Sequence, residues 1–368
     1  FGYVAWDNSS YSGRCSFFEG MEQPLVPESV GWFMLIGFGG FISVITTVVS
    51  YWAEKHVSLS DSNGGNIGDH FSAGNIVRSG FTCLDITSKR SWVGTSLLAA
   101  TVAYRYGVSG PLWYAAASAW YLPVFAIIGV DVKRYRPGVL TLPQMMGSRF
   151  GVTSHKVYTF FCLASNFLTC VTLFVGGAYL IRGVTGVNVY ASALLLPLSA
   201  VVYTAQGGIM GSYIAAWINL AITFSVAFTF MFQVYAAHPD LGSPAKVFSN
   251  VMDVTARSPV EGNDDGSLMT MLSYDGSLFA LVMAFNLPGS VVCNQALFQA
   301  IVAAEPSETR VGILLGCLAA FAYPMAIGTT MGLGARALDL PLKEEELRLD
   351  LTTLATAVHM MGTGGAAA

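Results

Sequence analysis

Residues 81–106 read FTCLDITSKR SWVGTSLLAA TVAYRY, and this stretch decides how the rest of the chain is interpreted. It is long enough to cross a bilayer, which takes about 20 predominantly apolar residues. Its centre is polar, however, and carries the charged residues Asp85, Lys89 and Arg90. Charges at mid-membrane depth are costly, so they mark a pathway or a site by default. We therefore expect a helix broken at its centre; the alternative is a helix whose Asp85 and Lys89 pair at i, i+4 against a neighbouring helix.

The composition of the whole chain indicates an all-α polytopic membrane protein. Hydrophobic residues make up 54% of the sequence and charged residues only 11%, whereas a soluble domain usually carries about 25% charge. Several other apolar runs reach the length of a membrane span. The net charge of −4 says nothing about nucleic acid, but the sequence has no basic stripe that would bind it. The apolar runs make the lipid bilayer the expected partner.

No motif of a common enzyme class is present. The chain lacks HExxH, GxSxG and GxxxxGK[ST], so a membrane enzyme is disfavoured. The six cysteines form no CxxC pair, and the five histidines show no metal-ligand spacing. We therefore expect no catalytic residue, no bound metal and no cofactor apart from a co-transported cation.

The densest basic cluster, at 131–137, sets the expected orientation. It contains Lys133, Arg134 and Arg136, and the positive-inside rule places such a loop in the cytoplasm. Alternation of the spans then puts the N-terminus outside the plasma membrane. Asn8 begins an Asn-Ser-Ser tripeptide, which is a weak candidate for glycosylation on that side.

A second long apolar segment, 268–303, is also interrupted, and we expect its break at Asn286-Leu287-Pro288-Gly289. Four spans separate it from 81–106, so the two interrupted helices would run in opposite directions. Matching breaks of this kind are typical of inverted-repeat secondary transporters, with the site between the repeats. The chain after 268 is too short for a second full repeat, so we expect a fragment truncated at the C-terminus. The expected parts are an extracellular segment (1–30), an extra transmembrane helix (31–53), a cytoplasmic loop (54–79), the first repeat of five helices (80–237), an extracellular loop (238–267) and the incomplete second repeat (268–368).

The polar residues beside the two expected breaks are candidates for a solute pathway. Hydroxyl, amide and aromatic side chains suit a neutral polar solute, although the same residues also serve as interhelical packing and hydrogen-bonding groups. Backbone carbonyls freed at a break could coordinate a hard cation. The candidates for the substrate pathway are Trp92, Thr95, Asn294, Gln295, Phe298 and Gln299.

Four stretches resemble the solute:sodium symporter superfamily and, within it, the urea active transporter branch. They are YGVSGPLWYA at 106–115, TGVNVYA at 185–191, AAEPS at 303–307 and GLGARALDLP at 332–341. The resemblance covers about residues 31–362. It implies the leucine-transporter-like fold of five plus five inverted helices. It also implies a cation site that uses the backbone carbonyls of Ser88 and Ser91, with further ligands from a later helix.

The resemblance implies a secondary active transporter that takes up urea, or a similar small polar nitrogen compound, together with H⁺ or Na⁺ by alternating access. A site for urea alone needs no net charge, so Asp85, Lys89 and Arg90 leave the solute open. The alternatives are a symporter for another solute, such as a polyamine or an amino acid, and a transport-inactive membrane sensor with the same fold.

Overall fold

The computed structural model describes residues 17–18, 24–56, 77–136, 138–362 and 364–365. Within these ranges the chain is helical, and the β-structure consists of isolated bridges such as Val77 with Ala304. Among the described residues, six helices are long and apolar enough to cross a membrane. These findings confirm an all-α polytopic membrane protein. Asn8 and most of the loop at 54–79 lie outside the described residues.

The helices follow one another in an order close to the expected one. The span 31–53 corresponds to the candidate span Glu28–Trp52, and the segment 81–106 is divided into two helices. In chain order the elements are α1 (Glu28–Trp32), η2 (Phe33–Phe38), α2 (Gly39–His56), α4 (Ser79–Arg90), α5 (Val93–Tyr106), α6 (Ser109–Ala119), α7 (Tyr121–Tyr135), α8 (Leu142–Phe150), α9 (Val152–Thr185), α10 (Val189–Phe232), η4 (Gln233–Ala237), α11 (Pro244–Arg257), η5 (Asp264–Gly266), α12 (Tyr274–Val292), α13 (Gln295–Ala303), α14 (Thr309–Ile327), η6 (Gly328–Gly332), α15 (Leu333–Ala337), α16 (Glu344–Arg348) and α17 (Thr352–Met361).

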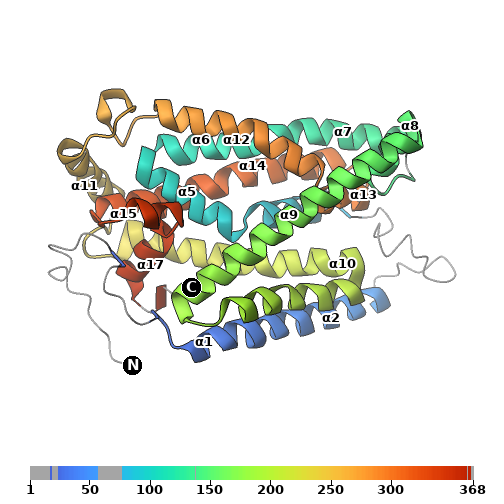
Figure 1. Cartoon of the computed structure of the whole chain (residues 1–368), viewed down its shortest axis with the longest axis horizontal. Coiled ribbons are helices and arrows are strands. Elements are labelled where there is room, and N and C mark those ends of the chain that lie inside the picture. Colours follow the sequence, from blue (N-terminus) through green and yellow to red (C-terminus); the bar gives the residue numbers. More distant parts are fainter. Residues whose placement is uncertain (1–16, 19–23, 57–76, 137, 363, 366–368) are drawn as a thin grey trace.

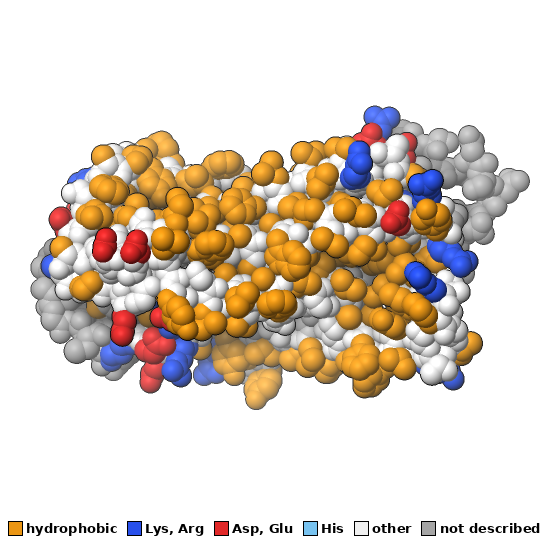
Figure 2. All heavy atoms as spheres, turned by 90° about the horizontal axis from the view of Figure 1, so that it is seen from above, with side chains coloured by type: hydrophobic (Ala, Val, Ile, Leu, Met, Phe, Trp, Pro, Cys, Tyr) orange, Lys and Arg blue, Asp and Glu red, His pale blue; other side chains and the backbone are white. Residues whose placement is uncertain are grey.

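Most of the long helices run along the long axis of the molecule, and α9 crosses them obliquely (Figure 1). Apolar side chains cover the middle of the surface in Figure 2, while Lys and Arg side chains gather at the end that holds α8 in Figure 1. An exposed apolar belt with charged ends is the surface that a bilayer requires, because lipid tails solvate apolar side chains and exclude charge.

The sequence predicted a loop at 238–267. In the structure this segment contains the 14-residue helix α11. Ser243 caps this helix by accepting a hydrogen bond from the Lys246 amide, and Pro244 occupies its first turn. Val247, Val251 and Val254 are buried on one face. Spacing of four and three residues places them on one stripe of a helix, and burying this stripe stabilises α11.

The helix pair α4 and α5 and the helix pair α12 and α13 run in opposite directions and are joined at both ends. At one end the Val77 amide donates to the Ala303 carbonyl (3.1 Å) and the Glu305 amide donates to the Val77 carbonyl (2.8 Å). At the other end the Val108 amide donates to the Leu268 carbonyl (2.8 Å). Gly107 permits this approach, because a Cβ there would lie 2.0 Å from the Leu268 oxygen.

Candidate functional site

The first break lies at Ser91 and Trp92, between α4 and α5. Trp92 is extended (φ −83°, ψ 164°), so the helix cannot continue through it. The Ser91 amide donates to the Thr87 carbonyl (2.8 Å), and the Thr95 hydroxyl donates to the Arg90 carbonyl (3.0 Å). The break leaves fewer intrahelical partners for the last carbonyls of α4, and Thr95 supplies one of the replacements.

Asp85 and Lys89 form a salt bridge one turn before the break, and it reaches the second broken helix. Lys89 Nζ lies 2.6 Å from Asp85 Oδ2 and donates to the Ala296 carbonyl of α13 (2.7 Å). The Asp85 side chain is 1% exposed and that of Lys89 is 26% exposed. Lys89 therefore satisfies the expected i, i+4 pairing and at the same time connects the two broken helices.

Several buried polar atoms at this break have no hydrogen-bond partner within the described part of the chain. They are Asp85 Oδ1, Arg90 Nε and Ser91 Oγ, with the Tyr121 and Tyr213 hydroxyls. Aromatic rings flank the two cations, since Arg90 lies 5.8 Å from the centre of the Tyr121 ring and Lys89 lies 6.0 Å from that of Tyr213. A buried polar group without a partner costs about 1–3 kcal/mol. Groups of this kind are expected where a ligand completes the hydrogen bonding.

The second break lies at Cys293 and Asn294, not at Asn286–Gly289 as the sequence analysis predicted. Asn294 has an extended backbone (φ −83°, ψ 106°), and its Oδ1 accepts a hydrogen bond from the Ala296 amide (2.9 Å). This is an N-cap that begins α13. Asn166 of α9 donates to the Cys293 carbonyl (3.1 Å) and to the Cys162 carbonyl (2.7 Å), so a neighbouring helix supports the interruption.

Pro288 does not interrupt α12 because a neighbouring side chain compensates for its missing amide. A proline inside a helix leaves the carbonyl four residues earlier without its donor. That carbonyl belongs to Ala284, and the indole Nε1 of Trp120, between α6 and α7, donates to it (3.2 Å). The helix therefore continues through Pro288 to Val292.

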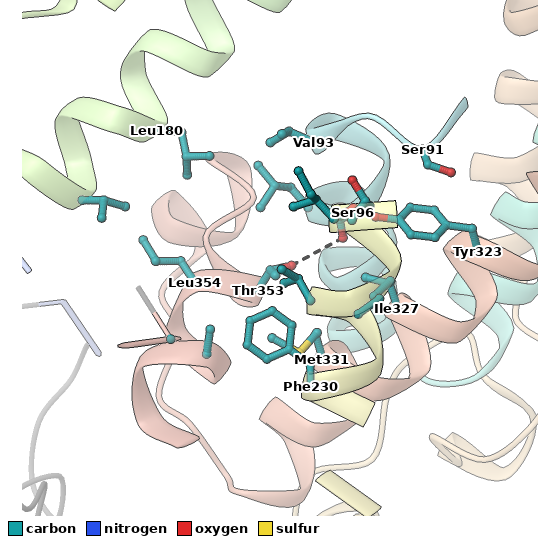
Figure 3. Close-up of a pocket in the computed structure, with 18 residues that line it drawn as sticks. Ser91, Val93, Ser96, Leu180, Phe230, Tyr323, Ile327, Met331, Thr353 and Leu354 are labelled. Carbon is teal, nitrogen blue, oxygen red and sulfur yellow. Dashed lines mark hydrogen bonds between the residues drawn. The ribbon is translucent and has the colours of Figure 1, made fainter. Parts of the chain in front are cut away.

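A cavity of about 270 Å³ opens beside the first break, between α5, α9, α10, α14 and α17. Figure 3 shows Ser96, Tyr323 and Thr353 close together, with Phe230, Ile327 and Met331 next to them. The Ser96 hydroxyl lies 2.7 Å from the Tyr323 hydroxyl, and Thr353 donates to the Ser96 carbonyl (3.4 Å). A largely apolar cavity with a few polar groups is typical of small-molecule sites.

Ser91 is the only residue in the predicted set that also lines this cavity within the described chain. Ser88 lies one turn earlier, where Asn219 donates to its hydroxyl (3.4 Å). Thr95 is buried against α4 by its bond to Arg90, and Trp92 is 38% exposed with its ring over Gly94. The sequence therefore located the break correctly, but only part of the predicted set faces the cavity.

The predicted residues of the second broken helix have other surroundings. Asn294 caps α13, and Gln295 donates to the Leu140 carbonyl ahead of α8 (2.9 Å). Phe298 is 2% exposed and packs in an apolar cluster with Val132 and Cys162. Gln299 is half-buried on the same helix. In this conformation the cavity at the first break does not include them.

Other helices supply partners that the sequence alone did not indicate. Tyr323, Thr353 and Thr223 line the cavity, and Asn219 and Asn166 support the two breaks. A polar side chain within an apolar span is the signal that could have indicated Tyr323, Asn219 and Asn166. That signal does not show which break each residue supports.

Comparison with known proteins identifies the family. The model of the sodium:solute symporter family matches residues 82–342. The chain is 34% identical, over 99% of its length and 52% of the relative, to the urea-proton symporter DUR3 of Oryza sativa subsp. japonica. It is 29% identical to the urea active transporter of Saccharomyces cerevisiae, over 95% of this chain and 48% of that protein. The chain thus spans about half the length of the curated relatives it matches. Because the family model covers both broken helices and the α14 wall of the cavity, the chain belongs to the sodium:solute symporter family.

Proposed function

We propose that the chain is part of a secondary active transporter, not an enzyme, that couples uptake of urea or a similar small polar nitrogen compound to H⁺ or Na⁺ by alternating access. The carrying observation is the group of buried, unpaired polar atoms at the first break. The names of the rice and yeast relatives support urea as the solute and, for the rice protein, the proton as the coupling ion.

Urea fits the chemistry of these atoms. Its carbonyl accepts hydrogen bonds and its amino groups donate them, so it requires both kinds of partner in one site. Arg90 Nε is a donor, Asp85 Oδ1 is an acceptor, and the hydroxyls of Ser91 and Tyr121 can serve as either. Bound solute would satisfy groups that the protein otherwise leaves unpaired.

The coupling cation is proposed to bind at the backbone carbonyls of Ser88 and Ser91, with further ligands from a later helix. Both residues lie at the end of α4, where the helix stops and carbonyls lose their regular partners. Oxygen ligands of this kind suit a hard cation such as Na⁺. If H⁺ is the coupling ion, a protonatable group must carry it, and Asp85 is the buried carboxylate of α4.

We also propose a plasma-membrane location with the N-terminus and Asn8 outside. The basic residues Lys133 and Arg134 lie in the last turn of α7, and Arg149 lies in the last turn of α8. These helix ends lie at the same end of the molecule (Figure 1). The positive-inside rule assigns that end to the cytoplasm.

The buried Nε of Arg90 supports a second candidate solute. Arg90 Nε has no hydrogen-bond partner within the described chain, and Arg pairs with carboxylates through parallel hydrogen bonds. The carboxylate of an amino acid would form an ion pair with Arg90, which the neutral carbonyl of urea cannot do. Asp85, in contrast, would favour a cationic solute such as a polyamine.

Uptake of labelled urea by cells that express the full-length protein tests the proposal. We expect saturable uptake that unlabelled urea inhibits and that an amino acid or a polyamine does not. Removal of Na⁺ and a change in external pH identify the coupling ion. Binding of urea without uptake would support the transport-inactive sensor instead, and inhibition by an amino acid alone would replace urea as the solute.

A further inference from the structure

Two histidines that are 121 positions apart in the sequence meet an aspartate at the end of the molecule that holds α11 and α15. Ligand atoms of His238, Asp240 and His359 all lie within 4.8 Å of one another. The two imidazole rings are 6.0 Å apart between centroids and are inclined by 40°. His238 and Asp240 follow η4, and His359 belongs to α17. The sequence shows no metal-ligand spacing among the histidines because the fold, not the local sequence, brings these residues together.

The turn that carries His238 and Asp240 is held in place by the start of α11. Lys246 Nζ donates to the Pro239 carbonyl (2.5 Å), and Asn250 donates to the Asp240 carbonyl (3.4 Å). Leu241, the next residue, is fully buried. Two of the three ligand groups are therefore positioned by a supported backbone turn.

The donor set and its spacing suit a divalent transition metal. Two imidazoles and one carboxylate are common zinc ligands, and in a tetrahedral site with bonds of about 2.0–2.1 Å the ligand atoms lie about 3.4 Å apart. No two of these ligand atoms are more than 4.8 Å apart, so each pair must close by at most about 1.4 Å to reach this spacing. The Asp240 amide donates to His238 Nδ1 (3.2 Å). Binding through Nε2 would move the ring proton to Nδ1 and break this bond, whereas binding through Nδ1 would replace it.

Neither histidine lies in a candidate membrane span, and burial acts in the same direction on both imidazoles. Burial lowers the pKa of His238, and the nearby Lys246 lowers it further while Asp240 raises it. Burial and the neighbouring His238 lower the pKa of His359, and Asp240 again opposes the shift. Metals bind neutral imidazole, the form that a lowered pKa favours.

We propose that His238, Asp240 and His359 form a three-ligand site for a divalent transition metal of the Zn²⁺ class. Bound metal would join α17 to the turn after η4. Thr353 and Leu354 of the same α17 line the cavity at the first break. The metal site therefore includes a residue of a helix that lines the cavity, although none of the three ligand residues lines the cavity itself.

Titration of the purified full chain with Zn²⁺ against a chromophoric chelator tests this assignment. We expect one tight equivalent per chain, with affinity reduced about 100-fold or more by His238→Ala or His359→Ala, because even outer partners of metal ligands are worth about 10- to 100-fold. The control is His155→Ala, whose ring Nδ1 lies 2.8 Å from the Pro143 carbonyl in another part of the molecule. Absence of tight binding, or equal loss in the control, overturns the proposal.

A second variant keeps the test decisive if the alanine variants do not fold. The double variant His238→Cys/His359→Cys places two thiolates beside Asp240, and thiolates bind the softer Cd²⁺. We expect one Cd²⁺ per chain, and either Cys variant alone should bind it more weakly. No gain in the double variant means that the two positions do not approach closely enough, which overturns the proposal. Neither measurement requires transport, so failure here is distinct from failure of the proposed transporter function.

Discussion

The break at Ser91 and Trp92 opens beside a cavity, whereas neighbouring side chains support the break at Cys293 and Asn294. At the first break three side-chain atoms of α4 and the following residue, Asp85 Oδ1, Arg90 Nε and Ser91 Oγ, are buried without a partner. The described residues of α12 and α13 contain no such atom. Asn294 caps α13, Asn166 binds the Cys293 carbonyl, and Trp120 compensates for Pro288.

This difference indicates a division of roles between two helices that look alike in outline. Fully satisfied polar groups make a region rigid, whereas an unsatisfied buried group is tolerated mainly where function requires it. The second broken helix is thus suited to be a fixed wall. The first carries the groups that we propose bind the solute. Lys89, paired with Asp85, also donates to the Ala296 carbonyl of α13.

Among the substitutions that test this difference between the two breaks, that of Asp85 should have the largest effect on stability and uptake. Asp85→Asn leaves Lys89 without its counter-ion, and breaking a buried pair costs about 3–5 kcal/mol. We expect a value near the low end, since the Lys89 side chain is 26% exposed. Uptake should fall about 100-fold, which corresponds to about 3 kcal/mol. Thermal unfolding in detergent and uptake in cells measure the two effects.

The double variant Asp85→Asn/Lys89→Gln separates stability from transport. It removes both charges, so the unfolding temperature should recover most of the loss, while uptake should stay low because the acceptor at Asp85 is gone. Recovery of uptake together with stability would mean that the pair only holds the two broken helices together. The proposed difference in role between the break at Ser91 and Trp92 and the break at Cys293 and Asn294 would then be wrong.

The second prediction concerns the bond that lets α12 pass through Pro288. Trp120→Phe keeps an aromatic ring but removes the donor to the Ala284 carbonyl, so we expect a loss of about 1–3 kcal/mol in the free energy of unfolding. In a Pro288→Ala background the helix supplies its own amide, and the same substitution should cost much less. A double-mutant cycle of unfolding free energies measures this coupling. Equal costs in the two backgrounds would show that Trp120 does not compensate for the proline.

The third prediction tests the cap at the second break. Asn294→Ala should destabilise the protein by about 1 kcal/mol, because it removes the acceptor for the Ala296 amide. Asn294→Asp keeps an acceptor at the same place and should preserve stability. With urea as the solute, the concentration for half-maximal uptake should change little in either variant. A large rise in this concentration would place Asn294 in contact with the solute and contradict its supporting role.

Sequence alone predicted the membrane class, both interrupted segments and the place of the first break, because charge and small polar residues within an apolar span are local signals. It misplaced the second break, because the effect of Pro288 depends on Trp120, which lies 168 positions earlier in the chain. It also proposed Gln295 for the substrate pathway, and it could not indicate that Gln295 donates to the Leu140 carbonyl. Contacts between distant helices decide these roles, and no periodicity in one segment contains them.

The smallest expected effect on stability concerns Glu308. This residue lies near the bridge between Val77 and Ala304, where the start of α4 meets the end of α13. The Ser79 amide at the start of α4 donates to Glu308 (3.3 Å), and hydrogen bonds from Ser79 lower the pKa of this carboxyl below its ordinary value of 4.5. A carboxyl whose pKa is lower in the folded than in the unfolded protein stabilises the fold at pH values above its ordinary pKa. This stabilisation is lost as the pH falls through the lowered, folded-state pKa. Glu308→Gln should therefore reduce the unfolding temperature slightly at pH 7. In a scan at a pH below the lowered pKa, the difference from the parent protein should disappear. Unfolding scans at the two pH values measure this, with Glu305→Gln as the neighbouring control, and a difference that persists in acid would assign the effect to packing instead of charge.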